Sequence, residues 1–307
     1  MNRPPLRLDE LPAPPPGKRG WPWTVEPPAP SGIPGDLPPI TVVTPSFNQA
    51  EFIEATIRSV VLQGYPRLQY LVMDGGSTDG AMEIIQRYAP WISAWVSERD
   101  RGQSHAINKG FAQATGEVVA WLNSDDRYLP GTLHAVARQV ASHGAAAAWI
   151  GACRSVDPRG RVRYLIHPHG LELPTLADWV VSAWFAQPAS FYRRAAAKRA
   201  GPLDESLQSA FDVDFFLRLA KEGPFVGTDD LWVEETIHPA AKTSAFPGRS
   251  YAELHLVQIR NGYEQVALQQ MSREIDELTA FRRAAEKNPV NRLRFAVGSL
   301  LNRLKKR

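Results

Sequence analysis

Two adjacent carboxylates, Asp125 and Asp126, follow an apolar run that ends at Asn123. A pair of carboxylates just beyond a buried strand is costly unless a cation is bound there. Such a pair is typical of a Mg²⁺ or Mn²⁺ site that shares its coordination shell with substrate phosphates. The alternative is that the pair caps a helix, since acids favour helix N-termini. The pair alone does not choose between these functions.

Asp74 ends a second apolar run and opens the turn DGGSTDG. The glycines of this turn allow a ligand to approach the backbone closely, so the Asp74 carboxylate could accept a hydrogen bond from a nucleobase or a ribose. An isolated Asp in such a turn more often forms an Asx turn. Arg101, in the segment ERDRGQSHAINKG, could neutralise a diphosphate or form a surface ion pair of little energetic value.

Two further carboxylates, Asp212 and Asp214, lie at the start of the segment FDVDFFLRL. Residues two apart in a helix do not face each other, so only one of them is expected to face a cleft, where it could take a proton from an acceptor hydroxyl. His238 follows the predicted strand WVEETIH. A lone histidine is more often structural, but a proline, a lysine and a threonine follow this one closely, which favours a ligand function.

These chemically competent residues fall at the ends of predicted strands. Apolar runs predict strands at 40–47, 68–74, 91–98 and 116–123, and helical spacing predicts helices at 48–63, 81–88, 103–114 and 132–142. This alternation predicts an α/β fold with a mostly parallel sheet covered on both faces, in which ligands bind beyond the carboxyl ends of the strands. We expect these polar residues to converge there: Ser46, Asn48, Asp74, Asp100, Arg101 and Asn123–Asp126.

The pattern is less regular after residue 145. Strands are predicted at 145–153, 161–167 and 232–238, with a loop and a short strand at 184–194. Helices are predicted at 211–221 and over 251–286. We find no internal repeat.

Both ends of the chain differ in composition from its middle. Thirteen of the 26 prolines precede Ile40, which predicts an irregular segment. We expect a loose tail in which the rings of Trp21 and Trp23 adhere to the body of the protein. Residues 288–307 contain six Lys or Arg, no acid, and an apolar helical face. This tail suits an anionic membrane surface or a solvated helix that packs on the domain or on another subunit, and the sequence leaves both open.

Composition excludes several classes of protein. The net charge of +3 over 307 residues does not indicate a nucleic-acid-binding protein. One cysteine, Cys153, excludes an intramolecular disulfide. No apolar stretch is long enough for a membrane span, and the N-terminus has no apolar signal region. These features favour a cytoplasmic protein, and the basic tail extends this expectation to the inner face of the membrane.

Five segments, in order, resemble the signatures of family 2 glycosyltransferases. They are TVVTPSFNQAEFIEATIRSVVLQGYPRLQYLVMDGGSTDG, ERDRGQSHAINKGFAQATGEVVAWLNSDDRYLPG, QPASFYRR, ESLQSAFDVDFFLRLA and IHPAAKTSA. The resemblance covers about two thirds of the chain. It implies a GT-A fold at 40–245, between a proline-rich segment at 1–39 and a helical extension at 246–307.

The resemblance also implies which residues bind the donor. The segment at Thr44 resembles the first nucleotide-contacting loop, and Asp74 resembles the acid that contacts the base or ribose. The positions expected to bind the donor are Thr44, Pro45, Ser46, Asp74, Arg101, Asn123, Ser124 and Asp126.

Metal ligands and a base follow from the same resemblance. The expected ligands of Mn²⁺ or Mg²⁺ are Asp125, Asp126 and His238. Asp212 resembles the family's base, with Asp214 as a rival. Two positions depart from the family pattern: Asn123 replaces the first acid of the DxD motif, and Phe211 replaces the acid before the base.

These residues predict a metal-dependent inverting glycosyltransferase. It would move a sugar from a nucleotide-diphosphate donor to a glycan or a lipid-linked acceptor in polysaccharide or cell-envelope assembly. The alternative is a non-catalytic nucleotide-sugar-binding or scaffold protein that retains the fold. The absence of GxGxxG and GxxxxGK[ST] motifs argues against dinucleotide binding and P-loop chemistry.

Overall fold

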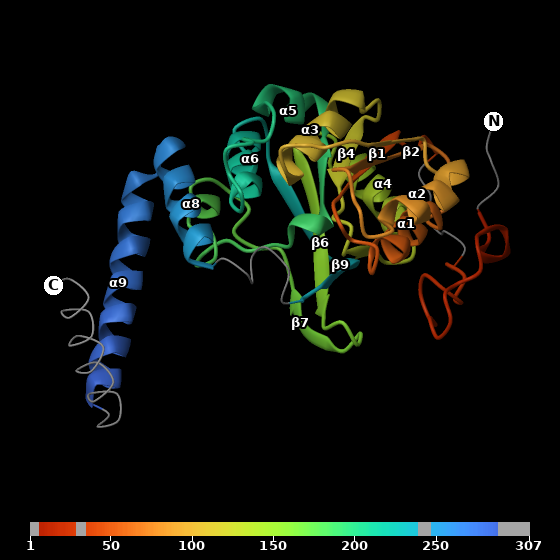
Figure 1. Cartoon of the computed structure of the whole chain (residues 1–307). Helices are drawn as coiled ribbons and strands as arrows, with labels where there is room; N and C mark the ends of the chain where they lie inside the picture. The colour runs from red at the N-terminus through yellow and green to blue at the C-terminus, as the bar shows by residue number, and fades with distance from the viewer. Residues whose placement is uncertain (1–5, 29–34, 239–246, 288–307) are drawn as a thin grey trace. The chain divides into compact units, whose positions relative to one another are not determined.

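The computed structural model describes residues 6–28, 35–238 and 247–287. The chain forms two compact units, Met1–Val257 and Gln258–Arg307 (Figure 1). The boundary between the units falls at Val257, inside a helix, and the expected limit of the GT-A segment at residue 245 stays a prediction. The two units are described separately below.

The first unit is built on a nine-stranded sheet with the order β3-β2-β1-β4-β8-β6-β9-β5, in which β7 pairs with β6. Four strands are parallel neighbours, as predicted: β1 (Ile40–Ser46), β2 (Leu68–Asp74), β3 (Ala94–Ser97) and β4 (Val118–Trp121). The remaining strands are β5 (Arg127–Tyr128), β6 (Ala148–Val156), β7 (Val162–Ile166), β8 (Ser190–Arg193) and β9 (Phe225–Thr236). Strand β8 is antiparallel to β4 and β6, whereas β6 and β9 are parallel.

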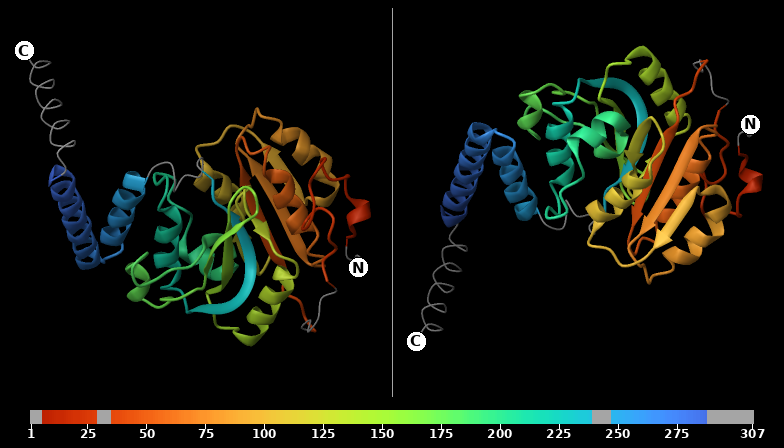
Figure 2. Two further views of the ribbon diagram at one scale, coloured as in Figure 1. Left: turned by 90° about the horizontal axis from the view of Figure 1, so that it is seen from below. Right: turned by 90° about the horizontal axis from the view of Figure 1, so that it is seen from above.

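Helices cover both faces of this sheet (Figure 2). They are α1 (Ile53–Val61), α2 (Ala81–Tyr88), α3 (Gln103–Gln113), α4 (Thr132–Ser142), α5 (Arg194–Ala200) and α6 (Phe211–Leu219). The first unit also contains most of α8 (Pro247–Arg260). Val42 of β1 belongs to the same buried cluster as Ile57 of α1. Its neighbour Val43 lies against α3, since successive side chains of a strand face opposite sides. The predicted α/β architecture is confirmed.

Gly110 allows α3 to pack directly on β1. A Cβ atom at this position would lie 2.4 Å from Cγ1 of Val43, which is far closer than two carbon atoms can approach. The close packing fixes the height of α3 above the sheet. Because α3 follows the carboxyl end of β3, its first residues lie at that edge of the sheet.

The proline-rich segment packs on the body of the protein, so the expectation of a loose tail is wrong for residues 6–28. Trp23 is buried, and Nε1 of Trp21 donates a hydrogen bond of 2.8 Å to the carbonyl of Tyr128. The segment has no regular structure apart from one short 3₁₀ turn at Leu8–Glu10.

Arg58 of α1 explains how an irregular segment can be held in place. Its side chain is fully buried and donates hydrogen bonds to the carbonyls of Pro12 at 2.8 Å and Pro22 at 3.0 Å, and to the hydroxyl of Tyr88 at 2.8 Å. Proline lacks an N–H but keeps its carbonyl acceptor, and a guanidinium group has five donors. One buried cation therefore replaces the hydrogen bonds that the segment does not form with a sheet.

The second unit contains the end of α8 and α9 (Glu264–Lys287). We predicted one helical segment over 251–286, and the structure divides it at Gly262, whose φ of +89° ends α8. Buried Gln258 and Gln270 then join the two helices through a 3.0 Å hydrogen bond. No helix among the described residues is long and apolar enough to cross a membrane. The basic tail at 288–307 lies outside the described residues.

Candidate active site at the carboxyl edge of the sheet

Two loops at the carboxyl edge, 47–52 after β1 and 75–80 after β2, are joined by hydrogen bonds. Asn48 has a left-handed backbone with a φ of 53°. Its N–H donates to Oγ of Ser77 at 2.8 Å, and its Oδ1 accepts from the N–H of Thr78 at 2.9 Å. Asp79 accepts from the N–H of Ala50 at 2.8 Å. The ends of β1 and β2 therefore form one surface.

Asp74 ends β2 and holds the second loop. Its Oδ2 accepts from the N–H groups of Gly76 and Ser77 at 3.0 and 2.9 Å and from Oγ of Ser97 at 2.7 Å, while Oγ of Ser77 donates to Oδ1 at 2.5 Å. Burial raises the pKa of Asp74, but these hydrogen bonds outweigh it and leave the pKa below its usual value. Asp74 forms the turn that we gave as its alternative function. Its contact with a base or ribose stays a prediction.

The start of α3 connects this surface to the end of β4. Oδ1 of Asp100 accepts from the N–H of Gly102 at 2.8 Å. Gln103 follows Gly102, and its Nε2 donates to Oδ1 of Asn123 at 2.7 Å. The amide of Asn123 donates in turn to Oδ2 of Asp126 at 3.2 Å. The expected convergence of the strand ends is confirmed for these residues.

Thr56 of α1 anchors the segment that carries the adjacent acids. Its buried hydroxyl lies 2.8 Å from the carbonyls of both Ser124 and Asp126. The Asp126 side chain is 5% exposed, and its Oδ1 accepts from the N–H of Thr236 in β9 at 3.3 Å. Asp126 thus faces the protein interior.

Asp125 meets His238, which lies 113 residues further along the chain. Nε2 of His238 is 3.0 Å from Oδ2 of Asp125, and the side chains are 7% and 20% exposed. The His238 ring stacks on Phe52 with a centroid distance of 4.9 Å. A segment after a strand of the parallel half and the second residue after β9 therefore lie in contact.

Negative charge accumulates around this contact. Burial raises the pKa of Asp126 well above its usual range, and the charges of Asp125 and Glu235 raise it further. The pKa of Glu235 is raised by burial, which outweighs its hydrogen bond from Ser155, and Asp125 raises it further. A cation would offset the repulsion among these three carboxylates.

The residues fit a cation only in part. The Asp125 carboxylate and the His238 imidazole are suitable ligands for Mn²⁺ or Mg²⁺. Both oxygens of Asp126 already accept hydrogen bonds. Within the described residues there is no cluster of three or more His, Cys, Asp or Glu side chains that could hold a metal ion. The protein could therefore supply two ligands, and a substrate would have to supply others.

The two candidates for the base have different surroundings. Asp214 is 9% exposed and forms an ion pair with Arg218 at 2.8 Å. Arg218 also donates to the carbonyls of Ala200 and Pro202, so Asp214 helps to hold the start of the loop before α6. Asp212 is half-buried in the first turn of α6, where its Oδ1 accepts from the N–H of the next residue at 2.8 Å.

The charge of Asp212 acts on Tyr192, and ring packing and hydrogen bonds join Tyr192 to the end of β4. The pKa of buried Tyr192 is raised by burial and, in addition, by the negative charge of Asp212. The Tyr192 ring packs on Trp121 at 5.3 Å, and the Trp121 carbonyl accepts from Nε2 of Gln187 at 3.1 Å. Oε1 of Gln187 accepts from Asn123 at 3.4 Å. A place for Asp212 in one site with the acids after β4 stays a prediction.

Two predicted donor-binding residues are engaged elsewhere. Arg101 forms an ion pair with Glu205 at 2.6 Å, which is the alternative that the sequence left open. Thr44 is fully buried, and its Oγ1 accepts from the hydroxyl of Tyr70 at 3.1 Å. Pro45, Ser46 and Ser124 are also buried. Their contact with a donor stays a prediction.

Sequence reasoning assigned no function to Gln103, Gln187, Glu235 or Phe52. Gln187 opens the segment QPASFYRR, which we used only for the resemblance. Its position at the start of a segment with a predicted short strand was the sequence signal that could have marked it as a site residue. The other three have no spacing relative to Asp125 that would reveal their contacts.

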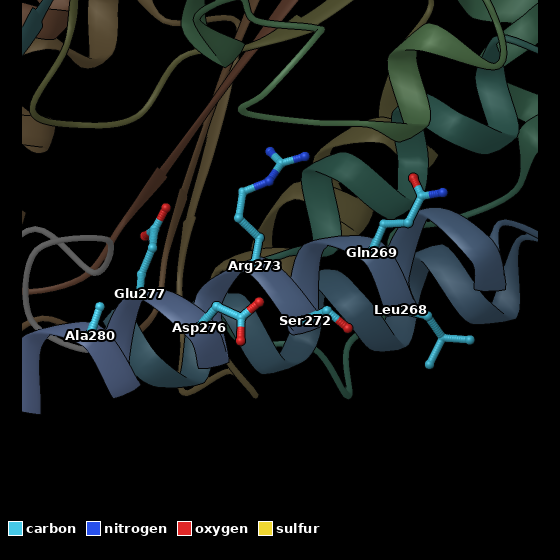
Figure 3. A pocket seen from close by; sticks show the side chains of 7 residues that line it. All are labelled: Leu268, Gln269, Ser272, Arg273, Asp276, Glu277 and Ala280. Atoms are coloured by element: carbon cyan, nitrogen blue, oxygen red, sulfur yellow. The ribbon is translucent and has the colours of Figure 1, made fainter. Parts of the chain in front are cut away.

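Two pockets among the described residues are lined by side chains other than those of this edge. One of about 760 Å³ runs along α9 in the second unit (Figure 3), and one of about 250 Å³ lies near Pro39 and Arg193. Neither contains a predicted site residue. Strand β1 starts next to Pro39, so the smaller pocket lies at the opposite end of the parallel strands.

Comparison with known sequences identifies relatives for the middle of the chain. Residues 41–201 match the sequence model described as glycosyl transferase family 2. An uncharacterized glycosyltransferase of Mycobacterium tuberculosis is 30% identical over 186 residues, which cover 60% of this chain and 69% of that protein. The putative teichuronic acid biosynthesis glycosyltransferase TuaG of Bacillus subtilis is 37% identical over 94 residues, or 30% of this chain and 37% of that protein.

Solved structures share the fold at lower identity. TarS residues 1–349 of S. aureus, in complex with UDP-GlcNAc, match with a TM-score of 0.58 and 22% identity over 72% of this chain and 65% of that chain. The mannosyltransferase PcManGT of Pyrobaculum calidifontis, in complex with GDP-Man and Mn²⁺, matches with a TM-score of 0.54 and 21% identity over 89% and 86%. The match covers only 39% of a longer TarS chain. These similarities show the GT-A fold.

Proposed function

Because the chain belongs to glycosyl transferase family 2, we propose that it transfers a sugar from a nucleotide-diphosphate donor to an acceptor hydroxyl. The transfer would need a divalent cation and would invert the anomeric centre. The observation that carries this proposal is the 3.0 Å contact between Asp125 and His238 at the carboxyl edge of the sheet. Ligands of open α/β sheets bind at such edges.

Asp125 and His238 would hold Mn²⁺ or Mg²⁺. Oδ2 of Asp125 and Nε2 of His238 lie 3.0 Å apart, and a carboxylate and an imidazole are both suitable ligands for such a cation. The donor's phosphate oxygens would complete the shell, as is usual for a cation held by few protein ligands. When bound, the cation would offset the negative charge that develops on the leaving diphosphate.

Asp212 is the proposed base. Asp214 is buried and already paired with the partly exposed Arg218, so use of Asp214 as a base would separate this guanidinium from its carboxylate partner. The Asp212 carboxylate would accept the proton of the acceptor hydroxyl as its oxygen attacks the anomeric carbon. Attack on the face opposite the diphosphate inverts that carbon in a single displacement.

The surface formed by loops 47–52 and 75–80 would bind the nucleotide. Asp74 would contact the base or ribose, as the resemblance implies, and would keep the loop in shape through the four hydrogen bonds described above. TarS and PcManGT are described with UDP-GlcNAc and GDP-Man, so these two donors are the first to test. A function in glycan assembly is supported by the description of TuaG.

The Asp212→Asn variant tests the proposal because it keeps the shape of the side chain and removes the base. With UDP-GlcNAc or GDP-mannose and Mn²⁺, we expect release of UDP or GDP to fall by about 10²-fold or more. The donor-induced shift in melting temperature should remain, since Asp212 is not a proposed donor ligand. Glu83→Ala, which removes an exposed acid of α2, is the control and should turn over like the wild type.

Two results would contradict parts of this proposal. Unchanged turnover by Asp212→Asn would exclude Asp212 as the base. A wild-type protein that binds both donors but turns over neither with Mn²⁺ would favour the non-catalytic alternative. Loss of Mn²⁺-dependent donor binding in Asp125→Ala and His238→Ala would support the cation site.

A further inference from the structure

A carboxylate from α8 binds the loop that leads into α6. Glu253 is 8% exposed, and its Oε2 accepts from three consecutive backbone N–H groups. These belong to Gln208 at 2.8 Å, Ser209 at 2.7 Å and Ala210 at 3.3 Å. Three donors that converge on one carboxylate oxygen form a specific anchor, because hydrogen bonds to a charged acceptor are about twice as strong as neutral ones.

The anchor holds the residues just before α6, a helix without a capping side chain. Ala210 is the N-cap residue of α6, and its side chain makes no capping hydrogen bond. Ser, Thr, Asp or Asn is preferred at that position, since a side-chain oxygen there satisfies an otherwise free N–H group. Glu253 provides a carboxylate for this turn from a different helix.

A second interaction fixes the orientation of Glu253. Nε of Arg249, one helical turn earlier in α8, donates to the other oxygen, Oε1, at 2.8 Å. Burial raises the pKa of Glu253, and the hydrogen bonds from Arg249 and the loop outweigh it, so the pKa lies below its usual value. The carboxylate therefore stays ionised at neutral pH, and all three loop N–H groups keep a charged acceptor.

The anchored loop lies directly before the proposed base. Ala210 and Asp212 are two residues apart, and the N–H of Asp214 bonds to the carbonyl of Ala210 at 3.0 Å. A shift of the loop would therefore move the first turn of α6. Displacement of a catalytic group by about 1 Å can cost a factor of about 100 in rate.

We propose that Glu253 is a positioning residue that sets the place of Asp212 by anchoring residues 208–210. This inference rests on the proposed function of Asp212 as the base. It assigns a catalytic contribution to α8, which lies beyond the segment 41–201 that matches the family. Helix α8 would then contribute to the reaction by positioning the base.

The test compares Glu253→Ala with Glu253→Gln, which keeps a neutral oxygen acceptor. With UDP-GlcNAc or GDP-mannose and Mn²⁺, Glu253→Ala should lower kcat by about 10- to 100-fold and leave the KM of the donor within about twofold. Glu253→Gln should recover part of kcat, because an amide oxygen can still accept from the loop. Glu83→Ala removes an acid elsewhere and should leave both constants unchanged.

The Asp212→Asn background separates positioning from a general loss of stability. If Glu253 acts through Asp212, Glu253→Ala should cause no further loss of kcat in Asp212→Asn. Multiplicative losses in the double variant would overturn the proposal, as would a kcat of Glu253→Ala equal to that of the wild type.

Amide hydrogen exchange gives a readout that needs no activity. Exchange at residues 208–210 should be faster in Glu253→Ala than in the wild type, while the peptide that contains α2 should be unchanged. Unchanged exchange at 208–210 would refute the anchor itself. A wild type without turnover would refute the proposed function, and the exchange result would still decide whether Glu253 holds the loop.

Discussion

Replacement of Asp74 tests how the carboxyl edge keeps its shape. The carboxylate accepts two backbone N–H groups and two serine hydroxyls and is fully buried. In Asp74→Ala the hydroxyls of Ser77 and Ser97 can rotate to other acceptors, but the N–H groups of Gly76 and Ser77 cannot. At about 1–3 kcal/mol for each of these two unsatisfied buried donors, the free energy of unfolding should fall by about 2–6 kcal/mol.

Asp74→Asn should cost less, about 1–2 kcal/mol, because an amide oxygen keeps both N–H bonds without the charge. The difference between wild type and Asp74→Asn should depend on pH. The pKa of Asp74 is lowered from 3.8 in the folded protein, so its contribution is complete above pH 3.8 and is lost as the pH falls toward the folded value.

Urea unfolding between pH 3 and pH 7 measures both effects. Asp36→Asn, which changes a side chain that is 98% exposed, is the control and should leave the free energy of unfolding within about 0.5 kcal/mol. A loss below 1 kcal/mol in Asp74→Ala would refute the estimate from unsatisfied donors. A difference between wild type and Asp74→Asn that grows as the pH falls would refute the assigned direction of the pKa shift.

Two further substitutions test the packing that supports the edge. Arg58→Ala should lower the free energy of unfolding by about 3 kcal/mol or more, since the carbonyls of Pro12 and Pro22 lose a charged donor. Limited proteolysis should then cut within residues 6–28. Continued protection of that segment would contradict the role of Arg58. Gly110→Ala should cost about 1–3 kcal/mol in urea unfolding because its Cβ atom would overlap Val43. Addition of Val43→Ala should recover part of that loss, and a Gly110→Ala variant as stable as the wild type would contradict the close packing of α3 on β1.

The sequence predicted the parallel half of the fold well, because each strand there is a continuous apolar run. Strand β2 and helix α2 have the predicted bounds, and β1 ends one residue earlier than expected. Strand β3 starts at Ala94 rather than residue 91, since Pro90 places residues 89–91 in a 3₁₀ turn. The pattern of the apolar residues was sufficient where both faces of a strand are buried.

The part of the chain that contains β5 to β9 was harder to predict because its elements are short or exposed. Strand β9 starts at Phe225, but its polar residues from Thr228 to Asp230 hid that part of the strand. Helix α5, with the sequence RAAAKRA, has no apolar periodicity. Strand β5 has only two residues and depends on its pairing with β9. Tertiary contacts rather than local pattern define these three elements.

Site residues that follow a strand could be predicted, because the ends of the strands could be predicted. The contact of Asp125 with His238 follows from the order of the strands and from the family resemblance. The partners of Glu253 could not be predicted in this way, because a carboxylate that accepts backbone N–H groups of another segment leaves no trace in sequence spacing. The same holds for Thr56, which holds two carbonyls of the acidic segment about 70 residues away.

The departure from the family pattern at Asn123 has a physical explanation in this structure. The Asn123 amide accepts from Gln103 and donates to both Asp126 and Gln187. A carboxylate could accept the first bond, but it has no hydrogen with which to make the other two. It would also add a charge beside Asp126, whose pKa is already raised by burial and by the neighbouring acids. An amide at this position therefore joins the end of β4 to the segment that begins at Gln187, and in the proposed function Asp125 and His238 alone would bind the cation.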